Sequence, residues 1–538
     1  IDAFHQAGIG VILDWVPGGF CADAHGLATF NGQMLYEHEI HPNWGTHKFD
    51  FARGQVRSFL VSNALYWVET FHMDGIRMDG VSSMLYMNFG IDDPGQKRFN
   101  KLGTEEDLDA SAFIRQTNTT MGQLHPDVMM IAEESTAWPL VTKPASDGGL
   151  GFHFKWDMGW MNDTLHYMQT DFPWRPGNHR MITFSTMYQF NENFVLPLSH
   201  DEVVNGKCSL ISKMPPPYEN QFGGLRALYG YMAAHPGKKM LFMGGEFGQF
   251  IEWNYDDSLD WHLPQQYPMH KKMLEYSRAL NKFYCDHKAL WQVDFDWNGF
   301  QWIDCNDNEN SVVSFIRKAE DPSDYIVAVC NFTPEVRHDY RIGVPEKGSY
   351  IEVFNSDDEA FGGSGVKNEG EIKTEDVKWH DRDQSILLTI PPMATIYLRH
   401  KGQVASGRNS FDEAPAELEV RGHEEKSSAD KAEAAEAMPK KTVKRRTAAK
   451  KAEPSEGAPA DKPKRRGRPR MTEEEKAAAK AKREAEKAAK AAAEGEAAPK
   501  KARRRRSTAA KTTAKKTTRK TTAKKTASKT AKAAAGES

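Results

Sequence analysis

The chain has 538 residues, of which 39% are hydrophobic and 27% charged, and its formal net charge at pH 7 is −3. This near-neutral total hides a division, because residues 1–400 hold 32 Lys and Arg against 54 Asp and Glu, whereas residues 401–538 hold 39 against 20. The length is enough for two or three domains, and no run of about 18 apolar residues occurs, so no membrane-spanning helix is predicted.

Six segments of the acidic part share one pattern, a short apolar run that ends in polar residues. Their ranges are 10–17, 73–80, 127–135, 153–157, 193–202 and 238–248. Helix-like stretches such as residues 56–71 lie between them, and this alternation favours a parallel sheet with helical crossovers. Polar residues at the strand ends suit the catalytic face of a TIM barrel. An open doubly wound sheet would also alternate strands and helices, but no Gly-rich phosphate loop follows the first predicted strand. We therefore expect an α/β fold, a partial (β/α)8 barrel, over residues 1–290.

Six predicted strands are fewer than the eight of a closed barrel. The first ten residues, IDAFHQAGIG, resemble the end of a helix that leads into the first predicted strand. We therefore expect about two strands and their helices upstream of Ile1, so that the chain is an N-terminally truncated fragment. A barrel with such a gap exposes strand edges.

A different pattern follows the helical segment 270–284. Four segments rich in β-branched and aromatic residues are separated by turn residues, and their ranges are 311–318, 325–332, 351–355 and 395–400. Strands at this spacing predict an antiparallel arrangement. We expect a small C-terminal β-sandwich domain over residues 291–400.

Residues 401–538 are dominated by Ala, Lys, Thr, Glu and Pro, and no aromatic residue follows Phe411. Such a segment buries too little apolar surface to offset its ordering entropy, which predicts a disordered basic tail. Residues 441–538 carry about +22, and counterion release would let them bind nucleic acid or another polyanion. A solubilising tail and a polycation folded back on the acidic part remain alternatives.

Three local patterns lie within this basic segment. RGRP (Arg466–Pro469) resembles an AT-hook core, which lies along the minor groove of A·T-rich DNA. Thr472 and Glu475 form a capping box that predicts a solvated helix over residues 471–495. Residues 511–530 are a loose repeat that resembles the tails of linker histones.

The five cysteines are scattered, odd in number and without CxxC spacing. They are Cys21, Cys208, Cys285, Cys305 and Cys330. This pattern predicts reduced thiols in a cytoplasmic protein, with neither a disulfide framework nor a zinc site.

Charged residues end several predicted strands. Arg77 and Asp79 stand two positions apart in an otherwise apolar run, so in a strand they point to the same side. An idle ion pair and a functional pair both fit this spacing. Glu133 and Asp201 end two other strands, and a barrel can bring such acids together over its mouth. Retaining glycoside cleavage uses two carboxyl groups about 5–5.5 Å apart, although acids at strand ends also cap helices.

Four motifs are recognisable in chain order: DWVPG (14–18), DGIRMDGVSSMLY (74–86), AEEST (132–136) and LPLSHDE (196–202). They resemble the four signature regions of the alpha-amylase superfamily of glycoside hydrolases. Flanking stretches such as HPNWGT (41–46) and MLFMGGEFGQ (240–249) narrow the resemblance to the bacterial 1,4-alpha-glucan branching enzymes. The resemblance covers residues 1–400.

The resemblance implies catalytic roles for three acids. Asp79 matches the nucleophile, Glu133 the general acid/base and Asp201 the carboxylate that stabilises the transition state. Arg77 matches the residue that keeps the nucleophile ionised and oriented. Glu134 is a rival to Glu133, but one residue further along a strand it should project to the other side.

Two further substrate-binding residues follow from the resemblance, and one is missing. His200 matches a histidine that binds hydroxyls of the reacting sugar, and Asp14 matches an acid that supports and contacts the site. The first motif normally continues DWVPGHF, whereas this chain has Gly19 in place of the substrate-contacting histidine. Losing that donor costs about 1–3 kcal/mol if its partner is left unpaired.

The resemblance implies an enzyme that cleaves alpha-1,4-glucan and transfers the segment to a glucose 6-hydroxyl, which forms alpha-1,6 branches in glycogen by a retaining double displacement. No cofactor or metal is implied, and a monomer is favoured. Hydrolysis would use the same carboxylates, because the acceptor alone decides between the two reactions. The alternative is an inactive fragment or degenerate barrel that binds glucan or nucleic acid.

Overall fold

The computed structural model describes residues 1–403, except for 24, 25, 27, 28 and 30. The basic tail, with its RGRP motif, its predicted helix and its repeat, lies outside the described residues. Among the described residues, no helix has the length and apolar character needed to cross a bilayer.

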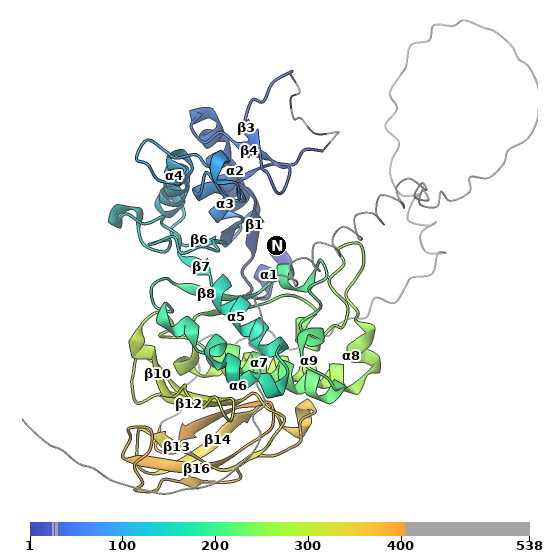
Figure 1. Cartoon of the computed structure of the whole chain (residues 1–538), viewed down its shortest axis with the longest axis vertical. Helices are drawn as coiled ribbons and strands as arrows, with labels where there is room; N and C mark the ends of the chain where they lie inside the picture. Colours follow the sequence, from blue (N-terminus) through green and yellow to red (C-terminus); the bar gives the residue numbers. More distant parts are fainter. Residues whose placement is uncertain (24–25, 27–28, 30, 404–538) are drawn as a thin grey trace, which may run out of the picture. The chain divides into compact units, whose positions relative to one another are not determined.

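Six parallel strands form one open sheet in the order β1-β5-β6-β7-β8-β9 (Figure 1). The strands are β1 (Ile12–Trp15), β5 (Gly75–Met78), β6 (Met129–Ala132), β7 (Phe154–Trp156), β8 (Phe194–Leu198) and β9 (Lys238–Leu241). Each lies inside one of the six predicted segments. Within the described residues β9 does not pair with β1, so the sheet is a partial barrel, as predicted.

Helices follow most of these strands and cover the sheet. They are α1 (Asp2–Gln6), α2 (Gly54–Phe71), α3 (Val81–Leu85), α4 (Leu108–Leu124), α5 (Met158–Gln169), α6 (Arg175–Asn178), α7 (Tyr218–Ala234), α8 (His262–Gln266) and α9 (Pro268–Asp286). Helix α2 buries Val56, Leu60, Ala64 and Val68, which recur every four residues and so form one apolar stripe. This stripe packs in one core with residues of β5, β6 and α4.

A small antiparallel sheet occupies the connection between β1 and α2. Its strands are β2 (Gly19–Phe20), β3 (Glu37–Ile40) and β4 (His47–Phe49), in the order β2-β4-β3. The sequence did not predict it, because its strands are two to four residues long and carry charged residues such as Glu37, Glu39 and Lys48. His38, Lys48 and Phe49 of this sheet line a cavity together with Asp79, which directly follows β5.

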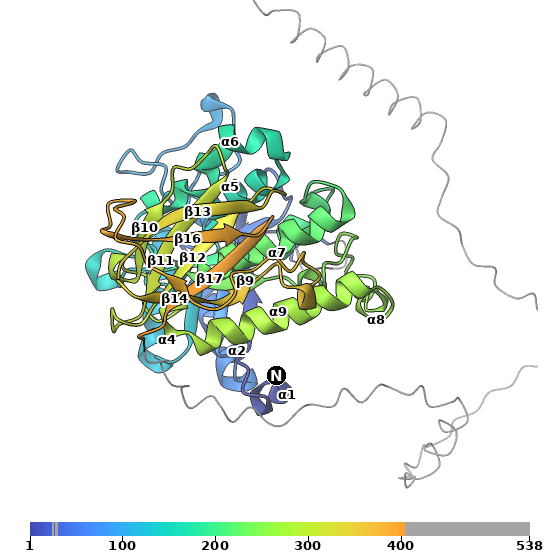
Figure 2. The same ribbon diagram turned by 90° about the horizontal axis from the view of Figure 1, so that it is seen from below.

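The C-terminal part of the described chain is antiparallel (Figure 2). One sheet has the order β10-β11-β12-β17-β14-β15, and β13 pairs with β16 in a second. The strands are β10 (Phe300–Asp304), β11 (Val312–Lys318), β12 (Tyr325–Asn331), β13 (Arg337–Val344), β14 (Ser349–Asn355), β15 (Ile372–Lys373), β16 (Gln384–Ile390) and β17 (Ala394–His400). The four predicted strands correspond to β11, β12, β14 and β17.

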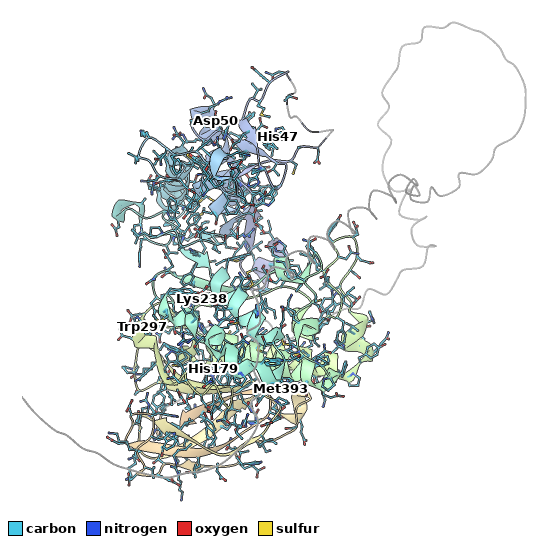
Figure 3. All side chains as sticks on the ribbon, viewed as in Figure 1. His47, Asp50, His179, Lys238, Trp297 and Met393 are labelled. Carbon is cyan, nitrogen blue, oxygen red and sulfur yellow. The ribbon has the colours of Figure 1, made fainter. Side chains whose placement is uncertain are left out.

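Buried polar contacts join this β-structure to the helices and the parallel sheet. Tyr397 of β17 donates to the Gly230 carbonyl of α7 at 2.5 Å. The Lys238 ammonium of β9 donates to the buried Asp294 carboxylate at 2.8 Å, and Arg317 of β11 donates to the same carboxylate at 2.7 Å. Figure 3 labels Lys238 and also Met393, whose side chain lies against Gly223 of α7.

Candidate active site

Arg77 sits at the centre of a carboxylate cluster at the carboxyl end of the parallel sheet. The pairing of β1 with β5 sets Asp14 opposite Arg77. One guanidinium nitrogen, Nη1, donates to Asp14 Oδ1 at 2.6 Å and to Asp79 Oδ1 at 2.5 Å. The guanidinium also lies over the Trp156 ring, 4.2 Å from its centroid. Arg77 is only 5% exposed, whereas the Asp14 and Asp79 side chains are 55% and 35% exposed, so water screens its contact with Asp14 more than its contact with Asp79.

Glu133 joins this cluster through the backbone of the β5–α3 turn. Gly80 adopts a left-handed conformation, with φ 62°, which few side-chain-bearing residues adopt. Its N–H donates to Glu133 Oε2 at 2.8 Å. Glu133 follows β6 directly, and its own N–H donates to the Met78 carbonyl at 3.0 Å. The turn therefore holds the carboxyl groups that follow β5 and β6 side by side.

Burial raises the pKa of both Asp79 and Glu133 above the ordinary values of these groups. For Asp79, the Arg77 charge opposes this increase, while the charges of Asp14 and Asp201 add to it. For Glu133, the Gly80 N–H and Arg77 lower the pKa, and the charges of Asp79 and Asp201 raise it. The Asp201 carboxylate therefore lies close enough to Asp79 and Glu133 for its charge to raise the pKa of both. A raised pKa suits Glu133 as a proton donor near neutral pH.

Glu134 has a different environment. It is fully buried, and its carboxylate accepts from the Ser82 hydroxyl at 2.9 Å and from the Lys155 ammonium at 2.6 Å. The Thr136 hydroxyl also donates to it. With these partners Glu134 ties the end of β6 to β7 and α3, which supports Glu133 as the carboxyl group that faces the site.

Asp201 and His200 follow β8 in a 3-10 helix (His200–Val203). His200 Nε2 lies 3.4 Å from Asp201 Oδ1. The imidazole ring is held beside Phe242 and Trp253, with ring centroids 5.9 Å and 6.2 Å away. Both His200 and Asp201 side chains are partly exposed, so a bound molecule can reach them.

Position 19 has no room for a side chain on this backbone. Gly19 pairs with Lys48 across β2 and β4. A Cβ there would lie 2.2 Å from the carbonyl oxygen of His47, which Figure 3 labels, and 3.3 Å from the Lys48 Cα. Because these are backbone atoms, a side chain at this position requires β4 to move.

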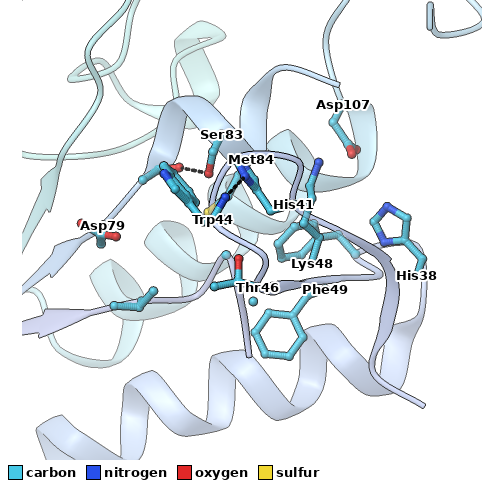
Figure 4. A pocket seen from close by; sticks show the side chains of 15 residues that line it. His38, His41, Trp44, Thr46, Lys48, Phe49, Asp79, Ser83, Met84 and Asp107 are labelled. Atoms are coloured by element: carbon cyan, nitrogen blue, oxygen red, sulfur yellow. Dashed lines mark hydrogen bonds between the residues drawn. The ribbon is translucent and has the colours of Figure 1, made fainter. Parts of the chain in front are cut away.

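A cavity of about 160 Å³ adjoins Asp79 and Gly19 (Figure 4). Its polar lining includes His38, His41 and Lys48 from the β3–β4 region. No sequence motif predicts a role for these three residues, although His41 belongs to the HPNWGT motif. Among the described residues, no group of three or more His, Cys, Asp or Glu is arranged to hold a metal ion. All five cysteines are unpaired.

Comparisons with known proteins agree with this architecture. Residues 302–401 match the family model described as "Alpha amylase, C-terminal all-beta domain". The chain is 57% identical over 407 residues to a 1,4-alpha-glucan branching enzyme GlgB of Halothermothrix orenii, an alignment that covers 75% of this chain and 64% of the relative. The corresponding enzyme of Aquifex aeolicus is 51% identical over 409 residues, with the same shares covered. The chain thus spans less than two thirds of the length of these curated relatives.

Two solved structures share the fold. A pullulanase from Bacillus acidopullulyticus matches with a TM-score of 0.52 at 15% identity, over 74% of this chain and 47% of the other. A type I pullulanase from Bacillus subtilis, complexed with maltose, matches with a TM-score of 0.52 at 14% identity, over 74% and 54%. At these identities the likeness shows the arrangement of the chain alone.

Proposed function

We propose, from the premise that the chain belongs to the family of the 1,4-alpha-glucan branching enzymes GlgB, that its carboxylate cluster performs the glucan transfer of such an enzyme. The observation that carries the proposal is the pair formed by Asp79 and Glu133. Asp79 is held by a buried guanidinium, and Glu133 is held by the Gly80 N–H one turn away.

In the first step, an Asp79 oxygen attacks the anomeric carbon of an alpha-1,4-linked glucose. The bond from that carbon to the leaving O4 breaks, and Glu133 gives its proton to O4. Arg77 favours the ionised form of Asp79 that this attack requires. The raised pKa of Glu133 keeps a proton available for the leaving oxygen.

In the second step, the 6-hydroxyl of another glucan chain attacks the same carbon. Glu133, now ionised, takes the hydroxyl proton, and the bond to Asp79 breaks, so the configuration is retained after two inversions. Asp201 stabilises the positive charge that develops on the sugar ring, since its carboxylate acts on the same group of ionisable residues. His200 donates to sugar hydroxyls, and Asp14 shares the Arg77 guanidinium.

The choice between transfer and hydrolysis rests on the relatives, because water and a 6-hydroxyl attack the intermediate through the same steps. The names of both relatives state glucan branching. The test incubates amylose with the full chain and follows iodine absorbance, reducing ends and chain lengths after debranching. Falling absorbance with new short chains after debranching and few new reducing ends supports branching. Rising reducing ends contradict it in favour of hydrolysis.

The proposal also covers the cellular location of the protein and its binding partners. We place the protein in the cytoplasm, a location supported by five unpaired cysteines. Besides alpha-glucan, the charge of residues 441–538 supports contact with a polyanion such as nucleic acid. Loss of DNA binding at physiological salt on removal of these residues tests that contact, and unchanged binding contradicts it.

A further inference from the structure

Trp156 connects strand β7 to Arg77, although none of the catalytic steps uses it. It is the last residue of β7 and pairs in register with Val195 of β8. In the sheet order β7 lies two strands from β5, roughly twice the ~4.8 Å spacing of neighbouring strands. The indole nevertheless reaches the guanidinium of Arg77, whose Cζ lies 4.2 Å from the ring centroid. One large side chain therefore spans β6 to meet the buried cation.

The hydrogen bonds of Arg77 do not by themselves fix the plane of its guanidinium. Only Nη1 donates to Asp14 and Asp79. Nε and Nη2 are buried and have no hydrogen-bond partner among the described residues. A guanidinium carries five N–H donors in one plane, and buried donors are normally paired. Bonds from a single nitrogen hold one corner of that plane and leave its tilt free, so another contact has to fix the tilt.

The Trp156 ring supplies this contact. A cation within about 6 Å of an aromatic centroid is attracted to the ring face, and the attraction is stronger where water is excluded. Both partners are buried, since Trp156 is 4% exposed and Arg77 is 5% exposed. The indole also packs with Ile131 and Val195 in one apolar cluster, which holds the ring in place. So little exposed surface leaves a substrate almost nothing to contact, so any effect of Trp156 on a reaction passes through Arg77.

The backbone that carries Trp156 is fixed by the next residue, Asp157. The Asp157 N–H donates to the Val195 carbonyl at 2.8 Å. Its carboxylate accepts from the Trp160 N–H at 2.8 Å, at the start of α5, and from the Tyr188 hydroxyl at 3.1 Å. The end of β7 is thus tied to β8 and to α5, which gives the indole a rigid base.

We propose that Trp156 is a positioning residue, which holds the Arg77 guanidinium in the orientation in which Nη1 reaches Asp79. The inference rests on the proposed function for the role of Asp79 as nucleophile. Without the ring, Arg77 keeps its charge but not its orientation. The Asp79 carboxylate then spends less time in the geometry of attack, which lowers kcat while substrate affinity is retained.

The kinetic test compares two changes at Trp156 with a matched change on the same strand. Trp156→Leu should lower kcat for glucan transfer about tenfold, with KM within about twofold of wild type. Trp156→Phe keeps an aromatic face, so its kcat should stay within about threefold. Phe154→Leu should leave kcat unchanged, because Phe154 lies two residues earlier on the same face and packs on Phe295, with ring centroids 5.9 Å apart. If Trp156→Leu does not fold, Trp156→Met takes its place.

A double-mutant cycle shows whether the effect passes through Arg77. In an Arg77→Gln chain the contact is already absent, so adding Trp156→Leu should cost no more than about twofold in kcat. A purely structural role would instead give the same tenfold loss in both backgrounds.

A second measurement does not depend on the reaction. NMR of the chain labelled with ¹⁵N-arginine follows rotation about the Arg77 Nε–Cζ bond, with the signal assigned by its absence in Arg77→Gln. We expect slow exchange of the two Nη groups in wild type and in Trp156→Phe, and faster exchange in Trp156→Leu.

The proposal is refuted if Trp156→Leu transfers glucan at the wild-type rate, or if its full loss persists in the Arg77→Gln background. An equal loss in Phe154→Leu, or an unchanged rotation in Trp156→Leu, also overturns it. A wild-type chain that transfers no glucan refutes the proposed function instead, and the NMR measurement still decides whether Trp156 holds the guanidinium.

Discussion

Arg77→Gln tests whether the guanidinium sets the ionisation of the nucleophile. Arg77 Nη1 lies 2.5 Å from Asp79 Oδ1 and 2.6 Å from Asp14 Oδ1, so the change leaves two adjacent carboxylates without their shared cation. Burial already holds the pKa of Asp79 above its ordinary value, and Arg77 is the main group that opposes the increase. Without it, the pKa of Asp79 rises further.

The size of the effect follows from the separation of the charges. An opposite charge within about 4–6 Å lowers the pKa of a carboxyl group by about 1–3 units, and each unit is worth 1.36 kcal/mol. Because attack requires ionised Asp79, the acidic limb of the pH–rate profile should move to higher pH by about the same 1–3 units. The loss of stability should be below the ~3–5 kcal/mol of a fully buried pair, since the Asp14 and Asp79 side chains are 55% and 35% exposed.

The assay is kcat/KM for glucan transfer across the pH range for wild type, Arg77→Gln and Arg77→Lys. Lysine keeps the charge but lacks the planar guanidinium, so its acidic limb should lie between the other two. An acidic limb that stays in place in Arg77→Gln, at an unchanged rate, would refute the electrostatic role assigned to Arg77.

Three other changes test the cluster and its surroundings. Asp79→Asn should abolish transfer. Because a raised folded-state pKa means that ionisation of Asp79 costs stability as pH rises above 3.8, the variant should resist urea at least as well as wild type at pH 7, and this advantage should disappear at acidic pH. Glu133→Gln should lose transfer from amylose yet retain a burst of fluoride release from an activated glucosyl fluoride, whose leaving group needs no proton; absence of the burst would contradict its role as acid. Gly19→Ala should destabilise the chain by about 1–3 kcal/mol in urea unfolding, because its Cβ meets the His47 backbone, whereas Gly54→Ala, with no atom within 4 Å of its Cβ, should not.

The parallel sheet could be predicted because each of its strands is a short apolar run that ends in polar residues. The side-by-side placement of Arg77 and Asp79 followed from their two-residue spacing in a strand. The contact of Asp14 with the same guanidinium nitrogen depends on the register of β1 against β5, which connects residues 63 positions apart. Spacing along the chain does not contain that register.

The residue patterns of other strands were too weak to predict them. Strand β13 begins with residues that are half-buried or exposed, so its sequence RHDYRIGV has no clear alternation. The β2-β4-β3 sheet owes its form to a close backbone approach at Gly19 and to pairings across a long connection. The position of Trp44 and His41 in the lining of the cavity beside Asp79 could therefore not be predicted, although the HPNWGT motif contains both residues.

The proposed mechanism requires that Asp79 forms a covalent bond to the glucan. The decisive experiment incubates the Glu133→Gln chain with alpha-maltotriosyl fluoride and then maps peptides by mass spectrometry. Fluoride leaves without a proton, so the intermediate forms, and its breakdown is slow because the variant lacks the base that activates the acceptor. We expect a maltotriosyl group on the peptide that contains Asp79, and none in the Asp79→Asn, Glu133→Gln double variant. A maltotriosyl group on a peptide containing Glu134 or Asp201 instead, or its persistence in the double variant, would show that Asp79 is not the nucleophile.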